Sequence, residues 1–421
     1  MSRKAIACLV VVFALAAYAL FTVLTSVTPL GPYANGRFFE PPCDFSLRMT
    51  EIKCLRLGVD PFDVWSGKVV MPPFKPNWQP RVEGPEFTEG INAYAPWEYT
   101  LMMPLSFLPR NVAWGVYWAL MMLSLAAVFA VAWRFGRRRG LSTESCAILA
   151  AAPIVLAAYP AWSNVCIGNF SVIVLFAVVM MAVCLNSGRD ALAGLFWALA
   201  MVKPQAGLVF AVPLLMKRRF LTCAVAAATC AAATLLPSAM CGASPLKLIV
   251  ETPKANAFMF QGCGTLPYFL AGFPGDVFVA LAVGVVVCWL LVRRVSQSTG
   301  DWFFVLMPAA ACSAAWTYAS TYGHVMSYFV FFAIVLMMLE SGVRGGAGVA
   351  FALAAVFSTR IYNAFHGFTA AFPGAFPGVG ADVELHRHLD SLNSLADLAI
   401  CALAVALLAS RARGKTEGGG R

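Results

Sequence analysis

Charged residues are scarce in this chain, and their scarcity excludes a soluble domain. Only 12% of the 421 residues are Asp, Glu, Lys or Arg, whereas 60% are hydrophobic. Apolar runs of about 17–23 residues recur along the sequence, which is the length that a helix needs to cross the hydrocarbon core of a bilayer. We therefore expect an all-α integral membrane protein in which residues 1–421 form a single domain.

The sequence also lacks the patterns that would indicate a metal site. Its 13 cysteines are scattered, mostly within apolar runs, and no CxxC or Cys/His spacing is present. His386 and His388 lie two positions apart in a polar stretch, where we expect them to be solvated, and no Asp-x-Asp pair occurs. We therefore assign no metal.

Basic residues outnumber acidic ones, but their positions do not indicate nucleic acid as a partner. The formal net charge is +10, and the basic clusters lie at the ends of apolar runs, as the positive-inside rule predicts for cytoplasmic segments. Arg3 and Lys4 place the N-terminus inside. The run 5–27 that follows has no small-residue cleavage site, so we expect a retained span. The tail 411–421 is expected to be cytoplasmic as well.

These clusters predict about ten full transmembrane helices with both termini in the cytoplasm. Residues 97–108 form a short segment that Pro104 interrupts, and we place it as an interfacial or re-entrant segment. The expected spans are 5–27, 111–133, 146–159, 170–185, 221–236, 277–292, 302–318, 325–339, 348–358 and 395–409.

Between the fourth and fifth of these spans, residues 191–216 are expected to form a short helical hairpin. Its two arms, 191–202 and 207–216, are too short to cross a bilayer comfortably. Lys203 lies near the tip of the hairpin. An ionisable residue inside a membrane segment is costly and therefore a candidate functional residue, and the alternative is a lysine whose ammonium reaches the interface.

The first external loop, 28–96, is far longer than a connection between two helices requires. It carries many of the chain's carboxylates, and we expect short helices within it. Asp44 follows the first span closely, where a carboxylate at the mouth of a cavity could take a proton from a hydroxyl; the alternative is that Asp44 caps a helix. Asp60 precedes Pro61, so it either forms a turn or contacts substrate.

Two cysteine pairs fall in expected external loops. Cys43 and Cys54 belong to the first loop, and Cys241 and Cys263 belong to the loop that ends near Gly275. In an oxidising compartment each pair could close a disulfide, and the alternative is free thiols.

Several short motifs occur in a characteristic order along the chain. They are Asp44-Phe45, Gly58-x-Asp60-Pro61-Phe62, Tyr94-Ala95-Pro96, Pro104-Leu105-x-x-Leu108-Pro109, Gly168-Asn169-Phe170-Ser171, Ala193-Gly194-Leu195 and Lys203-Pro204-Gln205. Together they resemble glycosyltransferase family 87, whose members are polytopic GT-C enzymes that use polyprenyl-phosphate sugars, typically mannose. The resemblance covers residues 5–219 and extends to the rest mainly through the pattern of spans.

The resemblance implies a GT-C bundle with an acidic catalytic base in the first external loop, and Asp44 is the matching position. It also implies metal-independent transfer, with no cofactor other than the lipid-linked sugar donor as co-substrate. The leaving phosphate needs cations or hydrogen-bond donors, for which Lys203, His324 and Arg360 are the candidates. His324 matches the family pattern only in part, because the usual proline and tryptophan are missing, and it could instead be a structural histidine. Tyr94 either contacts substrate or belongs to the interfacial aromatic belt.

The resulting hypothesis is a membrane glycosyltransferase of the bacterial inner (plasma) membrane. It would move a hexose, with mannose favoured, from a polyprenyl-phosphate sugar to a lipid or glycan acceptor on the non-cytoplasmic face, with inversion. Its partners would be these substrates and membrane lipids, without nucleic acid. The alternatives are a transporter or flippase of lipid-linked sugars and an inactive scaffold. The sequence leaves the sugar, the acceptor, the linkage and the oligomeric state open.

Overall fold

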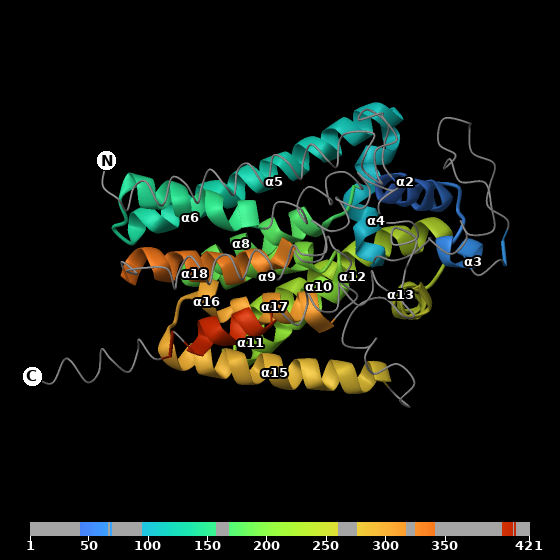
Figure 1. The fold of residues 1–421 in the computed structure, drawn as a ribbon. Helices are drawn as coiled ribbons and strands as arrows, with labels where there is room; N and C mark the ends of the chain where they lie inside the picture. The colour runs from blue at the N-terminus through green and yellow to red at the C-terminus, as the bar shows by residue number, and fades with distance from the viewer. Residues whose placement is uncertain are drawn as a thin grey trace, which may run out of the picture.

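A computed structural model describes residues 43–65, 68–69, 95–156, 168–259, 276–316, 325–341, 398–406 and 408–409. Within these ranges every regular element is a helix, which confirms the all-α expectation (Figure 1). The predicted spans 5–27 and 348–358 lie outside the described residues.

Two described helices are long and apolar enough to cross a membrane, namely α5 (Arg110–Arg138) and α12 (Phe220–Cys241). Helix α5 begins directly after Pro109, which suits a helix start because proline lacks the N–H that an interior position would need. Helix α12 ends at Gly242, which takes the left-handed conformation with φ 68°, as C-terminal glycines commonly do. The count of ten full spans stays a prediction.

Other helices occupy the positions expected for spans but differ in length. The sequence predicted one continuous span at 302–318, whereas the structure has α16 (Trp302–Val305) and α17 (Met307–Trp316), interrupted at Leu306. Pro308 follows this interruption, and it has no N–H to donate to the carbonyl oxygen of Phe304, four residues earlier. The remaining helices of this kind are α6 (Thr143–Leu156), α8 (Ser171–Asn186), α15 (Asp276–Ser298), α18 (Tyr328–Ser341) and the helical residues 398–406.

The loop expected after α12 contains a helix that the sequence did not predict. Helix α13 (Pro245–Met259) starts with proline, and the Ser244 hydroxyl accepts a hydrogen bond from the backbone N–H of Lys247 at 3.1 Å. Both are ordinary signals of a helix start. The lack of a long apolar run concealed this helix.

The hairpin at 191–216 is confirmed as two short helical arms. Helix α9 (Asp190–Ala200) is followed by α10 (Pro204–Gly207), the 3₁₀ turn η4 (Leu208–Phe210) and α11 (Ala211–Met216). The tip is tight, because a Cβ on Gly207 would lie 2.7 Å from the carbonyl oxygen of Ala200. At the open end, Arg219 pairs with Asp190 at 3.2 Å.

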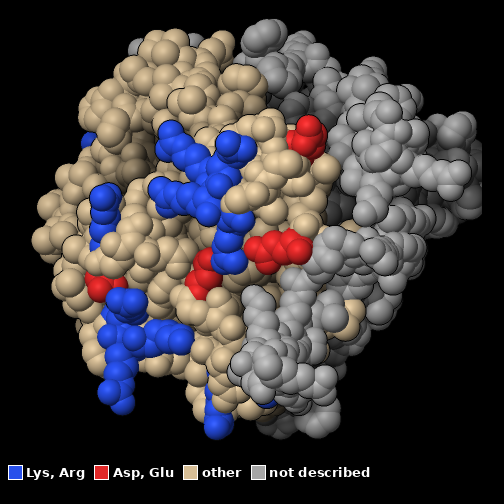
Figure 2. All heavy atoms as spheres, turned by 90° about the vertical axis from the view of Figure 1, so that its left-hand side faces the viewer, with Lys and Arg blue, Asp and Glu red and all other residues tan. Residues whose placement is uncertain are grey.

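One end of the molecule carries a cluster of basic residues. Figure 2 shows Lys and Arg side chains clustered on the face where α5 and α15 end and α12 begins. Arg139, just past α5, donates a hydrogen bond to Asp301 at 2.7 Å and another to Glu340 at 3.2 Å. These bonds join α5 to the start of α16 and the end of α18.

The opposite end carries helices of the first loop, α2 (Cys43–Arg56) and α3 (Pro61–Trp65), beside α4 (Pro96–Met102) and α13 (Figure 1). Residues 97–108 form a short, interrupted segment as expected, because α4 passes into the 3₁₀ helix η3 (Met103–Phe107) near Pro104.

Candidate active site

Helix α2 is polar in sequence, yet it is almost entirely buried. Among residues 44–56, whose burial is described, Arg56 alone is exposed. Burying polar groups is unfavourable unless each finds a partner, so such a helix indicates a function beyond packing. Its polar residues are Asp44, Ser46, Arg48, Thr50, Glu51, Lys53 and Arg56.

Polar partners from α5 and η3 fix the position of α2. Arg110 donates a hydrogen bond to the Ser46 hydroxyl at 3.1 Å. At the other end of the helix, the Arg56 guanidinium donates to the carbonyl oxygen of Ser106 at 2.8 Å and lies 4.2 Å from the centroid of the Phe107 ring.

Apolar contacts seat the same helix in the main core. The Phe45 ring, fully buried, packs against Trp114 and Tyr117 with both centroid distances at 5.3 Å. Because Phe45 adjoins Asp44, these rings set where the Asp44 carboxylate lies.

Asp44 contacts the beginning of α8. The Asn169 side-chain amide donates a hydrogen bond from Nδ2 to Oδ2 of Asp44 at 2.9 Å. Asp44 as a whole residue is partly exposed. Burial raises the pKa of the Asp44 carboxyl, and the Asn169 hydrogen bond and the positive charges of Arg48 and Lys203 oppose that rise.

The turn before α8 holds Asn169 in place. Gly168 adopts φ 73°, a left-handed conformation that favours glycine. The Asn169 Oδ1 atom accepts hydrogen bonds from the backbone N–H of Ser171 at 3.1 Å and from its hydroxyl at 2.8 Å. Asparagine commonly bonds to the backbone two residues on in such turns.

Lys203 reaches the same place from the tip of the hairpin. Its side chain is buried, and its ammonium donates to Asn169 Oδ1 at 3.2 Å and to the Ser171 hydroxyl at 2.8 Å. The structure therefore brings Asp44 and Lys203 together through Asn169. Sequence reasoning noted the Gly168–Ser171 motif but assigned no role to Asn169 or Ser171.

A further carboxylate, Glu98 on α4, lies in this charged region. Its side chain is completely buried, and neither carboxylate oxygen has a hydrogen-bond partner within the described ranges. Burial holds the pKa of Glu98 well above its ordinary value; the positive charge of Arg48 opposes this, and the negative charges of Glu51 and Asp44 add to it. No pattern in the sequence distinguishes Glu98 from the other acids near it.

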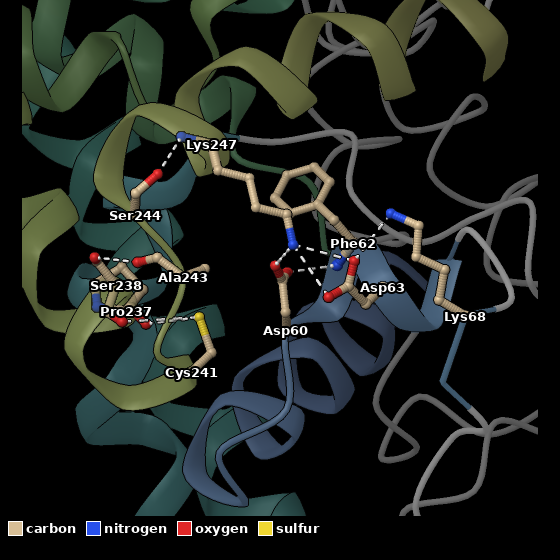
Figure 3. A network of polar contacts seen from close by, with 10 residues as sticks. All are labelled: Asp60, Phe62, Asp63, Lys68, Pro237, Ser238, Cys241, Ala243, Ser244 and Lys247. Atoms are coloured by element: carbon tan, nitrogen blue, oxygen red, sulfur yellow. Dashed lines mark hydrogen bonds and ion pairs between the residues drawn. The ribbon is translucent and has the colours of Figure 1, made fainter.

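Asp60 belongs to a separate polar cluster (Figure 3). Its Oδ1 accepts a hydrogen bond from the backbone N–H of Phe62 at 2.9 Å, which is the turn role that the sequence predicted. Lys247 on α13 donates to Asp60 Oδ2 at 2.6 Å and to both oxygens of Asp63 at 3.1 Å. A contact between Asp60 and substrate stays a prediction.

Three predicted site residues, Tyr94, His324 and Arg360, lie outside the described residues. In the part of the chain that the structure describes, no group of three or more His, Cys, Asp or Glu is arranged to hold a metal ion. Cys54 and Cys241 are free cysteines, while the Cys43 side chain and Cys263 are not described.

Comparison with known proteins gives one family match. Residues 92–252 match the model of glycosyltransferase family 87. The comparison with curated proteins finds no match. The matched stretch includes Glu98, Asn169, Ser171 and Lys203 but begins after Asp44. The contact between Asp44 and Asn169 therefore ties the candidate base to the matched stretch.

Proposed function

Since residues 92–252 match glycosyltransferase family 87, which indicates a glycosyltransferase, we propose that this protein transfers a hexose from a polyprenyl phosphate to a lipid or glycan acceptor. Mannose is the favoured sugar, and the transfer inverts the anomeric carbon. The observation that carries the proposal is the hydrogen bond from Asn169 to Asp44, because it places the Asp44 carboxylate beside the buried polar residues of the matched stretch.

In this reaction Asp44 acts as the general base. The acceptor hydroxyl attacks the anomeric carbon from the side opposite the phosphate, and its proton passes to Asp44. As the new carbon–oxygen bond forms, the bond to phosphate breaks, and the polyprenyl phosphate leaves with the electron pair. Asp44 Oδ2 already accepts the hydrogen bond from Asn169, so Oδ1 takes the proton.

The leaving phosphate requires positive charge and hydrogen-bond donors. Lys203 places a buried amine near Asp44 through Asn169, and we keep it as a candidate phosphate contact together with His324 and Arg360. Tyr94, directly before the buried Ala95 that precedes α4, is the candidate contact at the interface. No metal enters this mechanism.

The site is assigned to the non-cytoplasmic face. A basic cluster lies at the end of the molecule opposite α2, whereas Arg48 and Lys247 at the α2 end pair with acids. Basic segments are retained in the cytoplasm. This supports a multi-pass protein of the bacterial inner membrane with both termini in the cytoplasm and with Asp44 on the side where a prenyl-linked sugar is presented.

A transporter or flippase of lipid-linked sugars is the second candidate. The observation that favours it is the break between α9 and α10 at Lys203, because transporters often bind substrate at interrupted helices. A flippase, however, needs no base, and Asp44 would then have no chemical role.

A transfer assay separates the two candidates. Purified full-length protein is given labelled polyprenyl-phosphate-mannose and an extract of acceptor lipids, and product is measured for wild type, Asp44→Asn and Asp63→Asn. We expect Asp44→Asn to abolish transfer while the protein elutes as a folded species, and Asp63→Asn to retain it. Movement of the sugar lipid across vesicles without transfer would refute the enzyme and favour the flippase.

A further inference from the structure

We propose that Asn169 is a positioning residue for Asp44, and that Lys203 and Ser171 hold Asn169 in its working orientation. This inference rests on the proposed function, since it assigns a task to the residues behind the base. We call the hydrogen bonds that lead from Lys203 and Ser171 through Asn169 to Asp44 the relay.

The orientation of the Asn169 amide follows from its partners. Its Oδ1 atom accepts hydrogen bonds from the Lys203 ammonium, the Ser171 hydroxyl and the Ser171 backbone N–H. Each of these groups donates there, so the oxygen must face them and the Nδ2 hydrogens must face Asp44. A flipped amide would set its oxygen against the carboxylate and its hydrogens against an ammonium, which is doubly unfavourable.

The relay determines which oxygen of the Asp44 carboxylate can accept a proton. The bond from Asn169 occupies Oδ2 of Asp44 at 2.9 Å and restrains rotation of the carboxylate. Oδ1 is thereby directed at the acceptor, in the geometry that proton transfer in the transition state requires. Asn169 and Ser171 are both buried, so water does not compete for these bonds.

The relay also affects the charge of Asp44. On α2 itself, Arg48 pairs with Glu51 at 2.7 Å. From the neighbouring helices, the Glu98 carboxyl on α4 and the Tyr117 phenol on α5 interact electrostatically with Asp44. Burial favours the neutral, protonated form of Asp44. The opposing effects come from the Asn169 hydrogen bond and from the charges of Arg48 and Lys203, which favour the ionised carboxylate that a base requires.

The test is the pH profile of kcat for Asn169→Ala and Lys203→Met in the transfer assay. Loss of the hydrogen bond from Asn169 favours the protonated acid, so the acid limb is expected to move to higher pH by about one unit. At neutral pH kcat is expected to fall roughly 10- to 100-fold. Raising the pH should restore part of the lost kcat. A merely structural role would lower kcat equally at every pH, and that result would overturn the inference.

Two further variants keep the test decisive. Ser171→Ala removes one hydrogen-bond donor to Asn169, so it should shift the acid limb of the kcat profile in the same direction but by a smaller amount. This variant provides the test if Asn169→Ala does not fold. Lys247→Met removes a lysine that bonds Asp60 and Asp63 instead and should leave the limb in place. If Asp44→Asn remains active, the proposed base is wrong. If Asp44→Asn is inactive but neither Asn169→Ala nor Ser171→Ala moves the limb, only the relay is wrong.

Discussion

The buried pair in α2 allows a quantitative prediction about stability. Arg48 and Glu51 lie 2.7 Å apart, one turn apart on the helix, with side-chain exposures of 3% and 0%. Replacing Arg48 by Met leaves the Glu51 charge in the interior without its cation, and breaking a buried pair in this way costs about 3–5 kcal/mol. Replacing both, as Arg48→Met with Glu51→Gln, removes both charges together and should cost far less than either single change.

The measurement is the free energy of unfolding of the full-length protein in detergent, for wild type, both single variants and the double variant. From the four values a double-mutant cycle isolates the coupling of the pair. We expect a coupling of about 2 kcal/mol or more. The reasoning fails if Arg48→Met destabilises the protein by less than about 1 kcal/mol, or if the two single losses simply add in the double variant.

The remaining predictions concern pH, backbone space and the Lys247 cluster. Because burial raises the pKa of Asp44, transfer should decline on the acid side at a pH above the ordinary Asp value of 3.8, as a profile of kcat would reveal. Gly207→Ala should destabilise the protein by about 1–3 kcal/mol, since its Cβ would meet the Ala200 carbonyl; in contrast, Gly115→Ala in α5, where nothing lies within 4 Å of the new Cβ, should be tolerated. The hydrogen bonds from Lys247 and Lys68 lower the pKa of Asp63 against the effect of its partial burial, so this cluster stabilises the fold at neutral pH, and that stability is lost as pH falls through the lowered value. Wild type should therefore lose more thermal stability than Lys247→Met on acidification below pH 3.8, and equal losses would contradict the role of the cluster.

Features that depend on charge and length could be predicted from the sequence. The basic clusters are explicit in the chain, and the structure shows a basic cluster on the face where α5 and α15 end. The hairpin followed from two arms too short to cross a bilayer, with Lys203 between them. Lys203 could be singled out because an ionisable residue inside a membrane segment is costly, and the structure links it to Asp44 through Asn169.

Features that depend on contacts between distant segments could not be predicted from the sequence. Asn169 is one polar residue among many in the sequence, and only the packing of α2 against α5 and α8 brings it to Asp44, 125 positions away. In the sequence, Glu98 resembles the other acids near the first loop. Its burial depends on helices from other parts of the chain that pack over it, and the local sequence does not indicate those contacts. Helix α13 was missed for a different reason, since its capping signals are local but it lacks an apolar run.

The placement of α2 has a consequence for biosynthesis. This helix leaves the ribosome early, yet its hydrogen-bonding partners Ser106, Arg110 and Asn169 are made later. A half-polar helix of 14 residues is marginal on its own in water, so it must wait undocked until those partners have been inserted. A chain truncated before residue 169 would consequently present Asp44 without the Asn169 amide, and the contact between them can form only after the helices on either side of it have been made.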